Sequence, residues 1–501
     1  MFARVLSAAV LGIDAYIVEV ETDLEFRLPS LTTVGLAEGA VKESKERVTS
    51  AIKNSGYSFP QKRVTINLAP ADIRKEGSAF DLPMAIGILA ADGKIPPENL
   101  EKYVLLGELS LDGGVRHVRG VLPIATAVRD GRYEGIIVSK KNADEASLVD
   151  GISVYPVSHL AEVVEFLSGR IDIEKHTRPD IDFLLARKDN EIDFCDVKGQ
   201  AHVKRALEIA AAGSHNVLMI GPPGSGKTML ARRIPGILPM MTLEEALETT
   251  KIHSVAGMLC NGTPLVTERP FRDPHHGITE AALIGGGGFP RPGEVSMAQN
   301  GVLFIDELPE LGKKKIESLR QPMEDGTVTV SRASYTLTFP ASFMLVVAMN
   351  PCPCGFLTDP RHECTCSTSA IRCYLAKVSG PILDRIDIHI EVPAVHYRDL
   401  ADNSDTLEES RVMRERLDGA REIQKQRYHR SRGIHANAHI GPRLIKRHCR
   451  LDEQSEKILK RSIEAFGFSA RAYHRILKVS RTIADLDGEE NISARHISEA
   501  V

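Results

Sequence analysis

The sequence of 501 residues has no apolar run that approaches 18 residues, so we expect no transmembrane helix. The first twelve residues are apolar but lack a basic leader and a small-residue cleavage pattern, which favours a first strand over a signal peptide. The net charge of −4 excludes a polycation, so any contact with nucleic acid must come from local basic patches. These absences predict a cytoplasmic protein with no membrane partner.

Cysteine is scarce and unevenly distributed. Five of the eight cysteines lie between residues 352 and 373, which favours a metal site over a scattered disulfide framework.

The composition, 43% hydrophobic and 26% charged, is that of a soluble globular protein. The length exceeds that of one ordinary domain, and we find no long internal repeat.

Hydrophobic periodicity divides the chain into four parts. Residues 1–170 alternate apolar strands with helices, residues 171–192 are charged as expected of a linker, residues 193–395 form a second α/β segment, and residues 396–501 are helical and polar like a small lid. The expected strands are residues 16–20, 63–68, 104–106, 135–138, 217–220, 302–305 and 343–348, and the expected helices are 38–55 and 81–91. The last three strands are apolar throughout, which is typical of a buried parallel sheet.

The most specific motif is a glycine-rich loop between an apolar strand and a helical run at 229–234 that Pro235 is expected to stop. Its residues are Gly221, Pro222, Pro223, Gly224, Ser225, Gly226, Lys227 and Thr228. Glycines let backbone N–H groups approach phosphates, and the helix N-terminus adds its positive end. We expect Lys227 to reach the β- and γ-phosphates of ATP and Thr228 to hold Mg²⁺. A chance match is the alternative, and the strand–loop–helix context argues against it.

A second motif is the apolar strand at 302–305, which follows Gly301 and ends in Asp306 and Glu307. Asp306 suits Mg²⁺ coordination, and Glu307 suits polarisation of the attacking water as a general base. Alone, this pattern fits an acidic helix start equally well, but beside a phosphate loop the catalytic interpretation is favoured. The strand at 343–348 leads to Asn350, a polar group that could orient the water near the γ-phosphate.

Four further stretches are long and distinctive: FRDPHHGITEAALIGGG at 271–287, GEVSMAQNGVLFIDEL at 293–308, NPCPCG at 350–355 and SGPILDRID at 379–387. With the phosphate loop, they resemble the ComM/YifB family of magnesium-chelatase-like ATPases over essentially the whole chain. That family lies in the AAA+ branch with the magnesium-chelatase ATPase subunit and the MCM replicative helicases. The resemblance implies an α/β fold, with a P-loop AAA+ core of parallel sheet and helices followed by a helical lid.

The resemblance also implies a homo-hexameric ring with ATP bound between subunits. Arg385 then matches the trans-acting arginine finger and Arg471 the lid arginine that senses the γ-phosphate. Residues 272–296 would form an insert within the second helix of the core, and residues 327–339 a hairpin that points, like the insert, towards the pore. Arg332 is the candidate at the hairpin tip for gripping a phosphate backbone, and a structural turn arginine is the plain alternative.

Residues 1–170 resemble the Lon protease domain, on KEGSAFDLPMA at 75–85 and on the segment between 107 and 122. Aligned on these stretches, the nucleophile position is Ala79 and the catalytic-lysine position is Leu122. A serine–lysine protease needs a hydroxyl and a desolvated amine, so we expect a binding or assembly scaffold without protease activity. Ser78 lies one residue from the nucleophile position, which keeps a slipped alignment open.

The cysteines form two close pairs nine residues apart, Cys352 with Cys354 and Cys364 with Cys366. Four thiolates suit tetrahedral Zn²⁺ and leave no open position for water, so we expect a structural site. Reduced thiols in a loop are the alternative. Cys373 is a spare ligand candidate and His362 a weaker one.

Residues 411–450 contain twelve lysines and arginines against three acidic residues, a local excess of nine. Within this region Tyr428 lies among basic residues, so the region could serve nucleic-acid phosphates and one stacked base. A solvated lid face that meets a neighbouring subunit is an equal alternative.

Together these patterns predict an ATP- and Mg²⁺-dependent ring motor, and the family resemblance implies translocation on single-stranded or branched DNA to drive branch migration in recombination and natural transformation. Three alternatives remain. A magnesium-chelatase ATPase subunit would power metal insertion into a porphyrin, and the Lon-like segment argues against it. An ATP-dependent protease is disfavoured by the missing dyad. The third is an ATP-switched scaffold that does not translocate.

Overall fold

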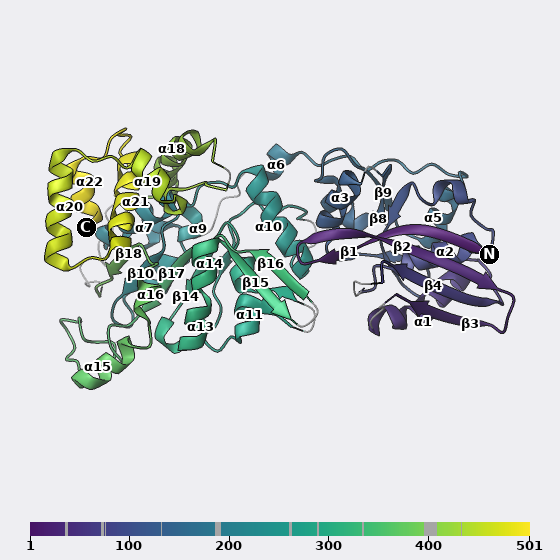
Figure 1. The fold of residues 1–501 in the computed structure, drawn as a ribbon, viewed down its shortest axis with the longest axis horizontal. Coiled ribbons are helices and arrows are strands. Elements are labelled where there is room, and N and C mark those ends of the chain that lie inside the picture. Colours follow the sequence, from purple (N-terminus) through teal and green to yellow (C-terminus); the bar gives the residue numbers. More distant parts are fainter. Residues whose placement is uncertain are drawn as a thin grey trace. The chain divides into compact units, whose positions relative to one another are not determined.

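The computed structural model describes residues 1–501 except 36–38, 72–74, 76, 132, 186–191, 260–262, 288–289, 333–334, 395–407 and 432. The chain forms two compact units (Figure 1): Met1–Ala186 with Ala246–Val266, and Arg187–Glu245 with Thr267–Val501. Among the described helices, none combines the length and the hydropathy that a membrane span requires.

The first unit is built on a seven-stranded sheet in the order β3-β4-β2-β1-β5-β8-β9. Its strands are β1 (Phe2–Leu11), β2 (Asp14–Glu25), β3 (Ser30–Val34), β4 (Arg63–Ala69), β5 (Tyr103–Leu105), β8 (Gly135–Ser139) and β9 (Ser153–Val157). β2 pairs antiparallel with both β1 and β4, and the other neighbours are parallel. The short strands β6 (Glu108–Leu109) and β7 (Val115–Arg116) form a separate antiparallel ribbon.

The described helices beside this sheet include α1 (Gly39–Asn54), α2 (Asp81–Ala91), α3 (Val121–Asp130), α4 (Ala143–Ser147), α5 (Leu160–Leu167) and α6 (Ile181–Leu185). α2 is the most deeply placed, because all its residues but Ala90 are buried. Its one carboxylate, Asp81, lies 2.7 Å from the guanidinium of Arg47 on α1. Burial nevertheless raises the pKa of Asp81 above its usual value, since the ion pair only partly offsets the desolvation.

The second unit is built on a parallel five-stranded sheet in the order β11-β14-β17-β10-β18. Its strands are β10 (Val217–Ile220), β11 (Phe271–Arg272), β14 (Val302–Ile305), β17 (Met344–Met349) and β18 (Ile388–Glu391). Every residue of β14 and β17 is buried, as expected of strands covered on both faces. The core helices are α7 (Ala201–Gly213), α8 (Lys227–Ala231), α9 (Ile234–Ile237), α13 (Lys313–Ser318), α14 (Arg320–Asp325), α15 (Thr368–Leu375) and α16 (Gly380–Leu383). Helix α10 (Leu243–Ala256) starts in this unit, and its residues from Ala246 onwards belong to the first unit.

The predicted insert is a hairpin between two short helices. Strands β12 (Gly285–Gly286) and β13 (Arg291–Pro292) pair antiparallel and lie between α11 (Glu280–Ile284) and α12 (Glu294–Met297). Gly285 has φ +115°, and a Cβ there would lie 2.7 Å from the carbonyl oxygen of Arg291, so the turn into β12 requires glycine.

The predicted hairpin at 327–339 is formed by β15 (Thr327–Arg332) and β16 (Tyr335–Pro340), which pair antiparallel. The turn at 333–334 and the side chain of Arg332 lie outside the described residues. The assignment of Arg332 to a phosphate contact therefore remains a prediction.

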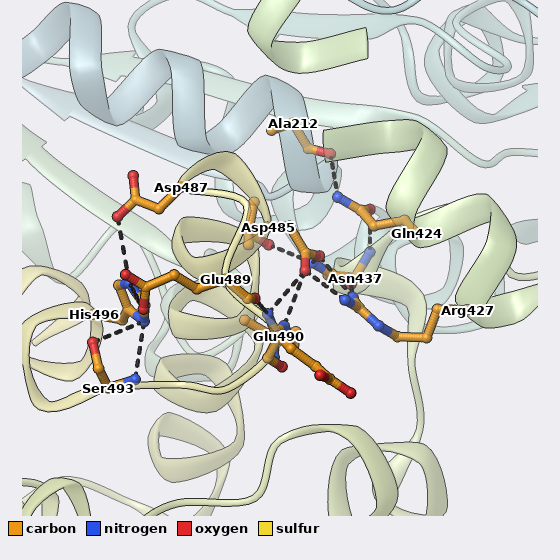
Figure 2. A network of polar contacts seen from close by, with 12 residues as sticks. Ala212, Gln424, Arg427, Asn437, Asp485, Asp487, Glu489, Glu490, Ser493 and His496 are labelled. Carbon is orange, nitrogen blue, oxygen red and sulfur yellow. Dashed lines mark hydrogen bonds and ion pairs between the residues drawn. The ribbon is translucent and has the colours of Figure 1, made fainter. Parts of the chain in front are cut away.

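The C-terminal part is the expected helical lid: α18 (Ser410–Tyr428), α19 (Pro442–His448), α20 (Glu453–Phe466), α21 (Ala470–Leu486) and α22 (Ala494–Ala500). A buried polar network holds it together (Figure 2). In this network Asp485 of α21 pairs with Arg427 of α18 and accepts a hydrogen bond from Asn437. Gln424 of α18 donates to the carbonyl of Ala212 in α7, so the network also joins the lid to the core of the second unit.

The expected elements are present: those at 81–91, 217–220 and 302–305 have the expected bounds, and the ends of the others are shifted. The strand expected at 16–20 is the longer β2, the one expected at 343–348 is β17, shifted by one residue, and the apolar N-terminus is β1. The interpretation of Pro235 as a helix stop is wrong: α8 already ends at Ala231, and Pro235 lies in the first turn of α9, where its missing N–H costs no hydrogen bond. The expected start of the helix at residue 38 lies outside the described residues.

Candidate functional site

The parallel sheet of the second unit brings three motifs to one edge. β17 lies between β10 and β14, with Ile220 opposite Met349 and Ile305 opposite Val347. Because the carboxyl ends of these strands share an edge, the glycine loop, the two carboxylates and Asn350 meet there. Ligands of open α/β sheets bind at such an edge.

The glycine loop has the backbone that a phosphate cradle needs. Gly224 and Gly226 adopt φ values of +75° and +89°, which disfavour any side chain. A Cβ on Gly221 would lie 2.1 Å from the carbonyl oxygen of Val392, so this position also requires glycine. Helix α8 begins directly after the loop at Lys227, so its N-terminal N–H groups face the cradle.

Lys227 is buried and its ammonium is folded onto the loop. Its Nζ donates to the carbonyl oxygens of Gly221 and Pro222 at 2.7 and 2.9 Å and to Oδ1 of Asn350 at 3.3 Å. Burial lowers the pKa of Lys227, and the nearby carboxylates of the Asp306–Glu307 pair only partly offset this. A bound phosphate would supply the anion that this ammonium lacks.

Thr228 and Asp306 meet as the Mg²⁺ hypothesis requires. The Thr228 hydroxyl donates to Oδ2 of Asp306 at 2.8 Å, so both oxygens can reach one cation.

Glu307 is exposed and has φ +52°, which is rare for a residue other than glycine. Such a conformation costs about 1–3 kcal/mol and is typical of functional sites.

The two predicted arginines are not joined to this site by any hydrogen bond or ion pair among the described residues of the chain. Arg385 follows α16 and has a side chain only 8% exposed, in contact with the carboxylate of Glu324 on α14 and the carbonyl of Pro381. Arg471 is exposed in the first turn of α21. The roles that the resemblance implies for Arg385 and Arg471 therefore remain predictions.

The four predicted cysteines converge and form what we call the cysteine cluster. The Sγ atoms of Cys352, Cys354, Cys364 and Cys366 all lie within 4.8 Å of one another. The Cys352–Cys354, Cys354–Cys364 and Cys352–Cys364 distances are 3.3, 3.6 and 3.7 Å, near the ~3.8 Å that zinc–sulfur bonds of about 2.3 Å give in a tetrahedron. The N–H of Phe356 and the neighbouring thiols lower the pKa of Cys354 to about 6, whereas the pKa values of Cys364 and Cys366 are raised. The residues therefore fit a Zn²⁺ ion.

The spare ligand candidates do not join this group. Cys373 is exposed on α15, and the ring of His362 bonds to Asp359 at 3.0 Å.

The cysteine cluster approaches the phosphate loop. Gly355 has φ +86°, and a Cβ there would lie 2.5 Å from Cδ of Pro223. This contact between the cysteine loop and the phosphate loop could not be seen in the sequence.

The basic region at 411–450 differs from its sequence interpretation. Several arginines of α18 are used inside the second unit: Arg414 donates to the carbonyl of Gly236 at 2.7 Å, and Arg427 pairs with Asp485. The prediction of a stacked base on Tyr428 is wrong, because this side chain is 2% exposed and bonds to Asn437.

Exposed cations remain on and beside α19. Among the described residues, four exposed basic side chains of the region show no hydrogen bond or ion pair: Arg443, Lys446, Arg447 and Arg450. We call these the α19 patch. A contact with nucleic-acid phosphates and a solvated lid face both remain predictions for this patch.

The Lon-like positions carry no catalytic pair. Leu122 is buried in the first turn of α3, where its N–H donates to Glu145. The hydroxyl of Ser78 donates to Glu108, and no hydrogen bond joins Ser78 to a lysine among the described residues. The slipped alignment therefore gains no support from the described residues, and the scaffold role remains a prediction.

Comparisons with known proteins agree with this geometry. Three family models match: "Magnesium chelatase, subunit ChlI" over residues 193–400, "Subunit ChlI of Mg-chelatase" over 20–142, and "Magnesium chelatase, subunit ChlI C-terminal" over 407–501. The chain is 45% identical to the competence protein ComM of Haemophilus influenzae, covering 100% of this chain and 96% of that protein. It is 43% identical to YifB of Escherichia coli over 98% and 95% of the two chains. Lon protease 2 of Bacillus subtilis is 34% identical over 166 residues, which cover 30% of this chain and 29% of the protease.

Proposed function

Because the chain belongs to the magnesium-chelatase-like AAA+ ATPase family that includes ComM and YifB, we propose that it is a homo-hexameric ATP-driven motor that translocates on single-stranded or branched DNA. Branch migration in recombination and natural transformation is the process that we assign to it. The family supports an ATPase that uses ATP and Mg²⁺. The observation that supports a polyanionic track is the α19 patch, four exposed cations with no partner among the described residues.

The site residues divide the work of hydrolysis. Lys227 and the N–H groups of the loop hold the β- and γ-phosphates, and Thr228 and Asp306, already 2.8 Å apart, hold Mg²⁺. Glu307 accepts a proton from the attacking water, and Asn350 orients that water. The hydrogen bond between Lys227 and Asn350 supports this division, because it keeps the water-orienting amide beside the phosphate-binding ammonium.

Arg385 supplies the finger to the site of the neighbouring subunit, and Arg471 senses the γ-phosphate. In the single chain the guanidinium of Arg385 contacts Glu324. It must leave this carboxylate to reach a phosphate, so a subunit outside the ring should hydrolyse ATP slowly. A finger contributes about 10³–10⁵-fold to turnover.

The cysteine cluster binds one Zn²⁺ per chain. Four sulfur ligands leave no open coordination position, so the ion is structural. Its place after β17 and the contact of Gly355 with Pro223 support a bracing role for the segment between Asn350 and the phosphate loop.

A magnesium-chelatase role is the second candidate, and the names of the three family models favour it. The model over residues 20–142 itself carries the name of a chelatase subunit, so the Lon-like segment no longer argues against this role. The two candidates differ in their partner. A chelatase-type motor would respond to porphyrin-pathway subunits, whereas the proposed motor responds to DNA.

Fluorescence anisotropy with single-stranded, duplex and four-way-junction DNA, in the presence of an ATP analogue, tests the proposal. We expect binding at low salt with little sequence preference, because the patch offers phosphate contacts and no base-reading helix. An assembled ring that binds none of the three DNAs would refute the DNA motor and leave the chelatase-type role.

A further inference from the structure

Helix α21 carries a polar stripe along one face. Arg471, Arg475, Lys478 and Thr482 follow one another at spacings of four, three and four residues. At 3.6 residues per turn these spacings place the four side chains one above another. The stripe begins with the arginine assigned to γ-phosphate sensing. Of its other members, Arg475 bonds directly to the segment that carries the finger, and Thr482 is linked to it through His215.

Arg475 holds the backbone on both sides of Arg385. Its Nη1 donates to the carbonyl oxygen of Leu383 at 3.1 Å and also to that of Ile386. Its Nη2 lies 3.9 Å from Asp384. The Arg475 side chain is 18% exposed, so these bonds are made largely out of water. The Arg475 guanidinium therefore bridges the carbonyl two residues before the finger and the carbonyl one residue after it. This bridge fixes the direction in which the Arg385 side chain leaves the backbone.

A second tie joins the other end of the stripe to the same segment. The buried ring of His215 bonds to Oγ1 of Thr482 at 2.8 Å and to Oδ2 of Asp387 at 3.1 Å. Asn216, the next residue, donates from Nδ2 to the carbonyl of Arg385 itself at 3.0 Å. Burial alone would raise the pKa of Asp387, but His215, Lys478 and Arg475 lower it, which keeps this carboxylate charged.

The stripe is also fixed within the lid. Asn437 donates to Thr482 Oγ1 at 3.0 Å and to Asp485, which Arg427 holds from α18 (Figure 2). A helix that is bonded at several points moves as one rigid body. A displacement of Arg471 is therefore transmitted to the carbonyls of Leu383 and Ile386, to which Arg475 donates.

We propose that Arg475 is a positioning residue for the arginine finger: it couples the position of α21, and thus the nucleotide state sensed through Arg471, to the direction of Arg385. This inference rests on the proposed ring, in which Arg385 serves the neighbouring site. The role of Arg475 is thus exerted across a subunit boundary, although its contacts lie within one chain.

Mixed rings test this assignment, because defects in the finger and defects in a chain's own site complement differently. Arg475→Ala chains are mixed with Glu307→Gln chains and, separately, with Arg385→Ala chains, and basal ATPase is measured without DNA. The reference mixture is Arg385→Ala with Glu307→Gln. Ring assembly with ATP analogue is checked for every mixture.

If Arg475 acts on the finger, Arg475→Ala chains regain ATPase activity when they are mixed with Glu307→Gln chains, because those chains supply an intact finger. They gain no ATPase activity when they are mixed with Arg385→Ala chains. Restoration with Arg385→Ala chains, without restoration by Glu307→Gln chains, would mean that Arg475 serves its own site and would overturn the proposal. No restoration in the reference mixture would refute the trans-acting finger in the proposed function, and the inference would fail with it.

Arg475→Ala alone should lower kcat by about 10²-fold, as expected when a reacting group is misplaced by about 1 Å, and leave ATP affinity unchanged.

Two variants separate positioning from a general loss of folding. Arg475→Lys keeps a cation that can reach one carbonyl, so it should recover part of kcat and follow the same pattern of complementation. Arg461→Ala removes an exposed arginine from α20 of the same lid and should leave kcat unchanged. A loss of kcat in Arg461→Ala equal to that in Arg475→Ala would show that any disturbance of the lid has this effect and would overturn the assignment.

Discussion

The salt dependence of DNA binding offers the most quantitative test of the α19 patch. The perturbation is the double substitution Lys446→Gln and Arg447→Gln. Both side chains are exposed on α19 and have no hydrogen bond or ion pair among the described residues, so their loss should leave folding intact. Each phosphate contact contributes about −0.7 to −0.9 to the slope of log K against log salt concentration. Two lost contacts therefore flatten the slope by about 1.4–1.8.

The same arithmetic gives the change in affinity. Between 50 and 200 mM salt the wild-type ring should lose about 7- to 12-fold more affinity than the double variant, if both side chains contact phosphates. The assay is anisotropy with labelled single-stranded and four-way-junction DNA at four salt concentrations. The matched control, Lys460→Gln with Arg461→Gln, removes two exposed cations from α20 and should keep the wild-type slope. Equal slopes for the patch variant and the wild type would refute the reasoning and exclude the α19 patch as the DNA contact.

Five further outcomes are expected. Lys227→Ala should abolish nucleotide-dependent assembly, and Glu307→Gln should bind ATP but not hydrolyse it; near-normal turnover by the latter would remove Glu307 from the base role. Mixing Arg385→Ala with Glu307→Gln chains should restore some ATPase activity, and mixed rings no more active than the separate variants would contradict the trans assignment. Elemental analysis of protein purified without added metal should give one zinc per chain; well below one equivalent, with folding unchanged by a chelator, would leave the cysteine cluster as ordinary thiols. Gly355→Ala should weaken ATP binding without altering a phosphate ligand, because its Cβ would lie 2.5 Å from Pro223 and φ is +86°; normal ATP affinity in this variant would show that the two loops move independently.

The parts of the site that the sequence predicts are those fixed by local pattern. The strands at 217–220 and 302–305 have the predicted bounds because short apolar runs between polar breaks leave few alternatives. A parallel sheet then brings the ends of these strands together, so the meeting of Thr228 with Asp306 follows from topology. The cysteine pairs also converge as their spacing predicts.

The sequence could not predict which charged side chains are used internally. Arg427 and Arg443 look alike in a basic stretch, yet one pairs with a buried carboxylate that lies 58 residues away and the other is exposed. Tyr428 similarly lies among cations in the sequence but points into the lid core, because α18 places it on its buried face. Such outcomes depend on tertiary contacts, and no local pattern encodes them. The sequence also gives no sign of where the two units divide. Helix α10 runs without a break, yet its residues from Ala246 onwards belong to the first unit.

The measurement that tests the central claim most directly is the ATPase rate of the assembled ring with and without four-way-junction DNA. We predict that the junction raises the rate several-fold at low salt, that the increase falls as salt rises, and that the patch variant Lys446→Gln with Arg447→Gln loses most of it. A ring that assembles and hydrolyses ATP at one rate, whether or not any DNA is present, would contradict the account.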